Sequence, residues 1–359
     1  MLGVETLLLP VSFLDWLRTR LFSLLGPLGQ PIVRRPELRV ALRGSVAVLL
    51  ALTGTILLPL WILALGPLIL GVPHLLSDAR YLVVRPGHQR SPRLVLAVGI
   101  PLVICGLGVG MPAGLAALAG VFLVSDGALW RRCIGLSLVG ALALWGYAAH
   151  SFYPHELWLA HLHNPIGVLI WFLWRPRHER LHLIPLLLYV ACATVIGLGV
   201  VHALPFGLSA APHSDGSALE FFRDTLAPEF SETWGTRLVL LYCYAQMVHY
   251  SVWLQLVPEE DRPRPTPRSF RESLRVLFAD LSWPLLLLAM LIALSLLLFA
   301  LRDVWAARTA YFRLATFHGY LELCALGLYF VKGQRPQKAR RLVETAQGFL
   351  PVSAAAAHR

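Results

Sequence analysis

Apolar stretches long enough to cross a membrane recur along almost the whole chain, and no other feature of the sequence constrains the fold as strongly. A helix needs about 20 predominantly apolar residues to cross roughly 30 Å of hydrocarbon. Only 14% of the residues are charged, whereas a typical soluble domain carries about 25%. One soluble core cannot bury so many apolar stretches, so we expect an all-α polytopic transmembrane bundle of about ten spans. The expected spans are 44–61, 62–84, 94–111, 112–130, 133–151, 156–174, 183–204, 236–256, 281–301 and 306–331.

The positions of the basic residues support an even number of spans. If the N-terminus is cytoplasmic, all but five of the 31 Lys and Arg residues fall on the cytoplasmic side. This bias is the positive-inside signal, so we expect both termini in the cytoplasm and the protein in the cell inner membrane of a bacterium. The net charge of +11 is then a topology signal, and no nucleic-acid partner is expected. The five exceptions are Arg223, Arg237, Arg302, Arg308 and Arg313.

The polar segments divide the chain into three parts. Residues 1–35 mix Leu, Phe and Trp with charged residues, which is typical of an amphipathic helix in the membrane interface. Residues 336–359 are the expected cytoplasmic tail, which leaves 36–335 as a single transmembrane helical domain. The longest outer loop is 205–235, and the Pro- and Arg-rich inner loop 257–280 is expected to be a solvated connector.

Histidines paired with carboxylates inside the expected spans are the main chemical signal. His74 lies in GVPHLLSD with Asp78 one helical turn further on, and His318 lies in TFHGYLEL with Glu322 at the same spacing. Residues four apart share one face of a helix. A carboxylate in that position is the usual partner that orients a metal-binding imidazole. Ionisable residues inside a membrane are costly and therefore indicate function.

Two further expected spans also carry histidines, so four helices bring imidazoles to overlapping depths. His249 lies in the span 236–256, and His161 and His163 enter the span 156–174 from its outer end. Imidazoles that converge from several helices are how bundles build metal sites. Any one of them can instead form a hydrogen bond across a helix interface. The candidate metal ligands are His74, His161, His163, His249 and His318, and the candidate catalytic residues are Asp78, Glu322 and Tyr250.

Two stretches resemble the Brp/Blh membrane family of β-carotene 15,15′-dioxygenases. The family signature Gly-x-Pro-His-x-x-x-Asp is matched by Gly71, Pro73, His74 and Asp78. The segment from Tyr244 through His249 to Ser251 is similar to a second family motif, Tyr-Phe-x-x-x-His-Ser-x-x-His, although a Tyr intervenes before the Ser. Trp253 stands where that motif has its second histidine.

The resemblance implies a non-haem Fe(II) held by four histidines, and O₂-dependent cleavage of a carotenoid or another apolar lipid dissolved in the bilayer. Because of Trp253, His318 would supply the fourth ligand from another helix, or the site would hold a different metal. Aromatic side chains near the central histidines would wall a long apolar substrate. These are Tyr250, Trp253, Phe317 and Tyr320.

Other functions use the same residue types. In an intramembrane zinc hydrolase of the ceramidase type, three histidines and an aspartate would activate water, with Zn in place of Fe(II). In a transporter, His, Asp and Glu side chains would relay protons, although the internal repeat that many transporters carry is not found in this sequence. Two histidines could also ligate haem b.

Overall fold

The computed structural model describes residues 9–151, 153–174, 179–201, 217–262 and 267–334, and every regular element within these ranges is helical. Six helices in this part of the chain are long and apolar enough to cross a membrane. Each of them overlaps an expected span, so the prediction of an all-helical multi-span protein is confirmed to that extent. The six are Pro36–Leu57, Pro59–Val84, Pro92–Val109, Arg180–Gly197, Trp283–Ala300 and Val304–Lys332.

Each of the four remaining expected spans also overlaps a helix. These helices are α8 Met111–Val124, α9 Leu129–Ala148, α10 Tyr153–Leu173 and α13 Glu232–Ser251. Helix α8 is short, with 14 residues, and α9 carries Arg131 and Arg132 in its first turn. Helices α10 and α13 are less apolar because they carry histidines and other polar side chains. These polar side chains include His163 on α10 and His249 on α13.

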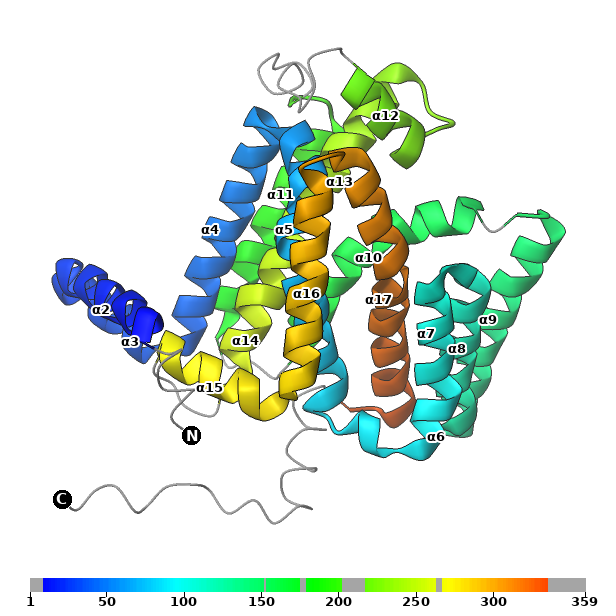
Figure 1. The fold of residues 1–359 in the computed structure, drawn as a ribbon, viewed down its shortest axis with the longest axis horizontal. Coiled ribbons are helices and arrows are strands. Elements are labelled where there is room, and N and C mark those ends of the chain that lie inside the picture. The colour runs from blue at the N-terminus through cyan, green and yellow to red at the C-terminus, as the bar shows by residue number, and fades with distance from the viewer. Residues whose placement is uncertain (1–8, 152, 175–178, 202–216, 263–266, 335–359) are drawn as a thin grey trace.

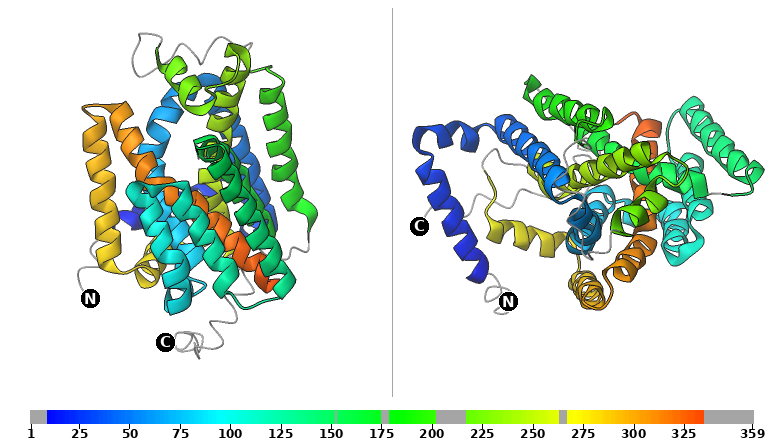
Figure 2. Two further views of the ribbon diagram at one scale, coloured as in Figure 1. Left: turned by 90° about the vertical axis from the view of Figure 1, so that its right-hand side faces the viewer. Right: turned by 90° about the horizontal axis from the view of Figure 1, so that it is seen from above.

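The long helices pack around a central pair, α5 and α17 (Figure 1). Helix α17, Val304–Lys332, packs against α5, Pro59–Asp78, and against α8 and α16. Helix α13 packs against α4, α10 and α11. Viewed from above, α2 and the α8–α9 pair lie at opposite sides of this bundle (Figure 2). The remaining α-helices are α2 Leu9–Leu24, α3 Gly29–Arg34, α4 Pro36–Leu57, α6 Pro92–Leu94, α7 Ile100–Ile104, α11 Leu183–Gly197, α12 Ser217–Leu226, α14 Val257–Glu260, α15 Phe270–Asp280 and α16 Trp283–Ala300.

The two longest connections carry helices at opposite ends of the bundle. Helix α12 lies at one end and α15 at the other (Figure 1). They belong to the expected outer loop 205–235 and the expected inner loop 257–280, respectively. The side-chain oxygen of Ser269 accepts a hydrogen bond from the Glu272 backbone amide and caps α15, which explains why that helix begins after the Pro-rich stretch.

The N-terminal helix α2 lies against the start of α15. The carboxylate of Asp15 accepts hydrogen bonds from the backbone amides of Phe270 and Arg271, at 2.7 and 3.1 Å. Phe13 and Trp16 of α2 are exposed, as an interfacial helix requires. The division of the chain at residues 35 and 335 stays a prediction, and the expected tail 336–359 lies outside the described residues.

The prediction of a solvated connector is wrong for the start of the 257–280 segment, because its charges are buried. Glu259 is 3% exposed, and its two oxygens lie 2.6 Å from Arg39 Nε and 2.7 Å from an Arg43 guanidinium nitrogen. Arg262 lies 2.8 Å from Glu259. Burial lowers the pKa of Arg262 to about 10, partly opposed by Glu259, so this arginine still carries its charge at neutral pH. The network joins α4 to α14.

Candidate metal centre

Four histidines from four different helices meet inside the bundle. His74 is on α5, His163 on α10, His249 on α13 and His318 on α17, and all four are buried. Their ring centres form a closed quadrilateral. The sides are 4.7 Å between His74 and His249, 5.0 Å between His249 and His163, 5.0 Å between His163 and His318, and 5.2 Å between His318 and His74. The depth comparison made from the sequence therefore identified helices that do meet.

Backbone carbonyls fix the orientation of three of these rings. His163 Nδ1 lies 2.8 Å from the Ala160 carbonyl, and His249 Nδ1 lies 3.3 Å from the Asn164 carbonyl. His318 Nδ1 contacts the carbonyl of Ala315. Because a carbonyl only accepts, Nδ1 donates in each case, and Nε2 keeps the lone pair that can bind a metal.

Two buried carboxylates complete the cluster. Asp78 Oδ2 lies 3.3 Å from His74 Nε2, and Glu322 Oε1 lies 3.4 Å from His249 Nε2. The Nε2 atoms of His74 and His249 are themselves 3.1 Å apart. Adjacent ligand atoms bound at about 2.0–2.1 Å to one metal lie roughly 2.8–3.4 Å from one another, octahedral sites being at the lower end and tetrahedral sites at the upper end. The three observed separations fall within this range, so the cluster has the spacing of a coordination shell.

The charges also fit a divalent cation. Asp78 and Glu322 are both 0% exposed, and their carboxylate oxygens have few hydrogen-bond donors among the described residues, the Trp253 indole beside Glu322 being one. Two buried carboxylates beside neutral imidazoles carry a charge that is costly unless a cation or protons neutralise it. Two sets of three residues could each hold a metal ion, because within each set the ligand atoms all lie within 4.8 Å of one another. His74 belongs to both sets. The sets are His74, His249 and His318, and His74, Asp78 and Glu322.

The helices that carry the cluster are irregular where they reach it. On α5 a π-helical segment, Ala79–Val84, follows directly after Asp78. On α13 another π-helical segment, Val252–Leu256, follows Ser251. Helix α10 contains Pro165, next to Asn164. Such local departures from α-helical geometry are frequent at functional sites, because they turn side chains in directions that a regular helix does not allow.

Two of the predicted site residues lie beside the cluster or away from it. His161 is directed elsewhere: its Nε2 lies 2.8 Å from the Leu226 carbonyl, and its ring packs on Tyr242. The ring of Tyr250 lies 5.3 Å from that of His74, and its hydroxyl accepts a hydrogen bond from Gln246. A catalytic role for Tyr250 stays a prediction. The sequence left the choice between His161 and His163 open, and the geometry brings His163 to the other three rings.

A cavity of about 480 Å³ leads to the cluster. It lies between α10, α12 and α17, and His163 and His318 form part of its wall. Exposed Thr225 and Thr309 lie at its outer end. Of the aromatic residues expected to wall a substrate, Tyr320 lines this cavity. Its size lies in the range of small-molecule sites, roughly 300–1,000 Å³.

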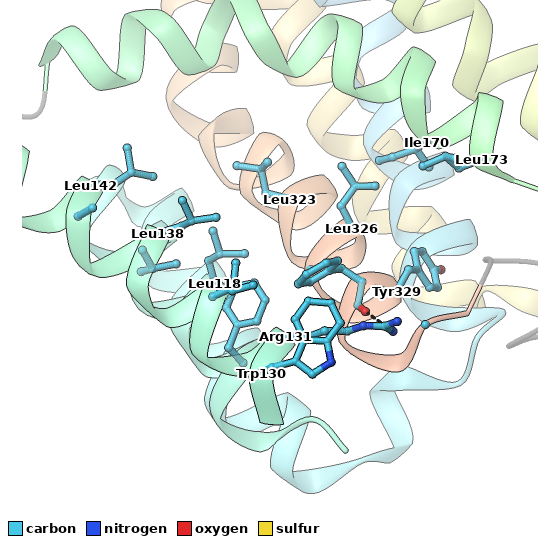
Figure 3. A pocket seen from close by; sticks show the side chains of 18 of the residues that line it. Leu118, Trp130, Arg131, Leu138, Leu142, Ile170, Leu173, Leu323, Leu326 and Tyr329 are labelled. Atoms are coloured by element: carbon cyan, nitrogen blue, oxygen red, sulfur yellow. Dashed lines mark hydrogen bonds between the residues drawn. The ribbon is translucent and has the colours of Figure 1, made fainter. Parts of the chain in front are cut away.

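A larger cavity of about 1110 Å³ lies elsewhere, between α8, α9, α10 and α17. Figure 3 shows its walls, which are formed mainly by apolar side chains such as Leu138, Leu142 and Leu326. Arg131 lies at its edge and donates a hydrogen bond to the Phe330 carbonyl. The histidines and carboxylates of the cluster do not line it. The smaller cavity is therefore the one relevant to chemistry at the cluster.

Sequence reasoning did not assign a role to three residues around this site. Arg308 lines the smaller cavity, although the sequence placed it only in the outer half of the membrane. Gly167 allows α10 to approach His249, since a Cβ atom there would lie 2.7 Å from His249 Cε1. Asn164 provides the carbonyl that orients His249. The run HNPIG was the available signal for the last two, because Asn, Pro and Gly close together inside a span are unusual for a helix that only packs.

Comparisons of this chain with protein-family models, with curated proteins and with solved structures found no match.

Proposed function

We propose that this chain is an intramembrane non-haem iron oxygenase that cleaves or oxidises a substrate dissolved in the bilayer. One observation carries the proposal: four buried histidines and two buried carboxylates meet beside a cavity, and His163 and His318 form part of its wall. Histidine and carboxylate ligands are the donor set of non-haem iron oxygenases, and iron held by three or four of these six donors would keep positions open for O₂. A site within the membrane suits a substrate that stays in lipid.

The resemblance to the Brp/Blh family supports the same proposal. His74 and Asp78, which carry the first motif, are both in the cluster. The ring of Trp253, at the position of the missing second histidine, lies 6.4 Å from the His74 ring. His318, with its ring 5.2 Å from that of His74, supplies the fourth imidazole from α17. We therefore propose a variant of that site in which one ligand has moved to another helix.

In this mechanism the protein's own residues hold, orient and shield the reacting groups. Iron(II), when bound, would supply the electrons that activate O₂. The three Nδ1 contacts to backbone carbonyls hold the rings of His163, His249 and His318 in place and leave the Nε2 lone pair of each ring free to bind a metal. The apolar walls exclude water from reactive oxygen species. Oxidative cleavage places one atom of O₂ on each carbon of the broken double bond, so it gives two carbonyl groups and needs no external reductant.

A zinc hydrolase of the ceramidase type is the second candidate. It is favoured by the set of His74, His249 and His318, whose nitrogen atoms lie within 4.8 Å of one another, with Asp78 beside His74. Three histidines that hold zinc leave one position for a water molecule. Such an enzyme would act without O₂, and this difference separates the two candidates.

The proposal includes ten crossings of a bacterial cytoplasmic membrane with both ends of the chain on the cytoplasmic side. It is supported by the overlap of each expected span with a helix and by the placement of α12 and α15 at opposite ends (Figure 1). In this orientation the buried Glu259 network lies at the cytoplasmic end, and the mouth of the 480 Å³ cavity faces the outer leaflet.

The proposal is tested by measuring metal and activity together. Detergent-purified protein should contain iron, and His74→Ala should lose it. Expression in a β-carotene-producing host should bleach the colour and yield retinal if β-carotene is the substrate, whereas unbleached colour excludes that substrate alone. Absence of any bound metal would overturn both enzyme candidates. Bound zinc with lipid hydrolysis that continues without O₂ would replace the oxygenase by the hydrolase.

A further inference from the structure

The 480 Å³ cavity contains one arginine, Arg308, which is 3% exposed. It lies on α17, and its guanidinium carbon lies 4.5 Å from the ring centre of Phe312 and 4.8 Å from that of Phe222. These rings hold the guanidinium plane and offset part of the cost of its burial. Arg308 is thus a fixed cation in the wall of the cavity that reaches the metal centre.

The second contact of Arg308 is a backbone carbonyl of α5 that a proline leaves without its helical partner. Pro67 has no backbone N–H, so the Leu63 carbonyl four residues earlier loses its usual helical partner. Arg308 Nε donates a hydrogen bond to this carbonyl at 2.9 Å. The contact uses one donor of the guanidinium and fixes the direction of the others.

Among the described residues, no carboxylate pairs with Arg308. Glu156 is the acidic residue of the cavity wall, and its Oε1 accepts a hydrogen bond from the Met111 backbone amide at 3.0 Å. That amide is the first of α8, where a helix favours negative charge. A buried guanidinium without an anion is costly, whereas planar carboxylates match its paired donors. Within the part of the chain that the structure describes, the cation of Arg308 therefore has no counter-anion.

We propose that Arg308 binds the carboxylate of the substrate, and that the substrate is a single acyl or polyene chain with one carboxylate end. Arg308 and His318 are ten residues apart on α17, which corresponds to about 15 Å along the helix axis. Residues of the same helix line the cavity between them, including Phe312, Ala315 and Thr316. A chain anchored at Arg308 thus reaches the histidines with its apolar part. Oxidation of the bound chain at the histidines rests on the proposed oxygenase function, whereas binding of its carboxylate to Arg308 does not.

The test compares probes that share one chain and differ in their head group. In nanodiscs, equilibrium binding is measured for oleate, oleyl alcohol and oleoyl lysophosphatidate. The wild type should bind oleate at least about tenfold more tightly than oleyl alcohol, since hydrogen bonds to charged groups contribute about 1.5–3 kcal/mol. Arg308→Gln should abolish this preference. Arg313→Gln is the matched control, because Arg313 is exposed on the same helix and does not line the cavity.

The outcomes separate this inference from the proposed function. An equal affinity of the wild type for oleate and oleyl alcohol would overturn the carboxylate site, and so would an unchanged preference in Arg308→Gln. Tighter Arg308-dependent binding of lysophosphatidate than of oleate would make the ligand a phosphate and overturn the carboxylate assignment. Metal content and elution volume of Arg308→Gln are measured on the same sample and should match the wild type. A wild type that binds oleate through Arg308 but lacks metal would overturn the oxygenase and leave this inference intact.

Discussion

At Gly167 the backbone of α10 lies directly against the imidazole of His249. A Cβ atom at this position would lie 2.7 Å from His249 Cε1 and 3.1 Å from Trp253 Nε1, and closer still to His249 Nδ1. Contacts of this kind force either the ring or the helix to move. Because His249 has its Nδ1 on the carbonyl of Asn164, three residues before Gly167, one shift would disturb both the ring and its partner.

We therefore predict that Gly167→Ala lowers the metal content of the purified protein by more than half while the protein remains folded. Overpacking of this size costs about 1–3 kcal/mol, and the displaced ring no longer presents Nε2 at the common point. Metal per protein and elution volume are the measurements. Gly140→Ala is the control, because a Cβ atom there meets nothing within 4 Å. A Gly167→Ala protein with wild-type metal content would contradict the described contact.

The pair His74–Asp78 could be predicted at the residue scale because a four-residue spacing fixes a shared helix face. Glu322 lies four residues after His318, but its carboxylate contacts His249 on α13, and a pairing between helices has no fixed spacing in the sequence. The choice between His161 and His163 could not be predicted in this way. Residues two positions apart on a helix, such as His161 and His163, point in nearly opposite directions. One of these two histidines must therefore face away from the cluster. Which one faces inward depends on the rotation of α10, and that rotation is set by tertiary contacts such as the approach of Gly167 to His249.

At the scale of elements, the junction of α4 with α14 depends on buried charges. Glu259 binds Arg39 and Arg43, and the Arg39 and Glu259 side chains are 2% and 0% exposed. Arg39 also donates hydrogen bonds to the Ile32 and Val33 carbonyls. Removal of one partner from such a pair leaves the other buried without its counter-charge.

Glu259→Ala should therefore destabilise the folded protein by about 3–5 kcal/mol. The free energy of unfolding in mixed micelles is the measurement. Glu179→Ala is the matched control, since the Arg35–Glu179 pair is exposed on both sides and lies 2.7 Å apart; its loss should be much smaller. Equal stability losses for the two variants would show that the Glu259 network does not hold the junction.

The irregular elements were the hardest to predict. Prolines are visible in the sequence, and Pro73 and Pro165 mark the helices that carry His74 and His163. The π-helical segments Ala79–Val84 and Val252–Leu256 leave no comparable signal, because any apolar run can adopt them when packing demands it. The burial of Glu259 was likewise hidden, because Arg39 and Arg43 are distant in the sequence.

At the scale of the whole molecule, the all-helical fold with several helices long enough to cross a membrane could be predicted from apolar length. Lipid forces the backbone into helices, so apolar length alone indicates the elements. The position of each helix in the bundle was not predictable, because uniformly apolar helix faces do not determine which helices pack together. The polar residues restrict the packing: α5, α10, α13 and α17 each bring a histidine to one cluster.

One paired measurement tests directly whether these four helices share one metal ion. His163→Ala and His161→Ala are purified side by side with the wild type, and metal per protein is determined. His163 lies between the rings of His249 and His318, at 5.0 Å from each, whereas His161 is bonded to the Leu226 carbonyl. If the four helices share one metal ion, His163→Ala loses most of its metal and His161→Ala retains it. Full retention of metal in His163→Ala would contradict a site shared by the four histidines.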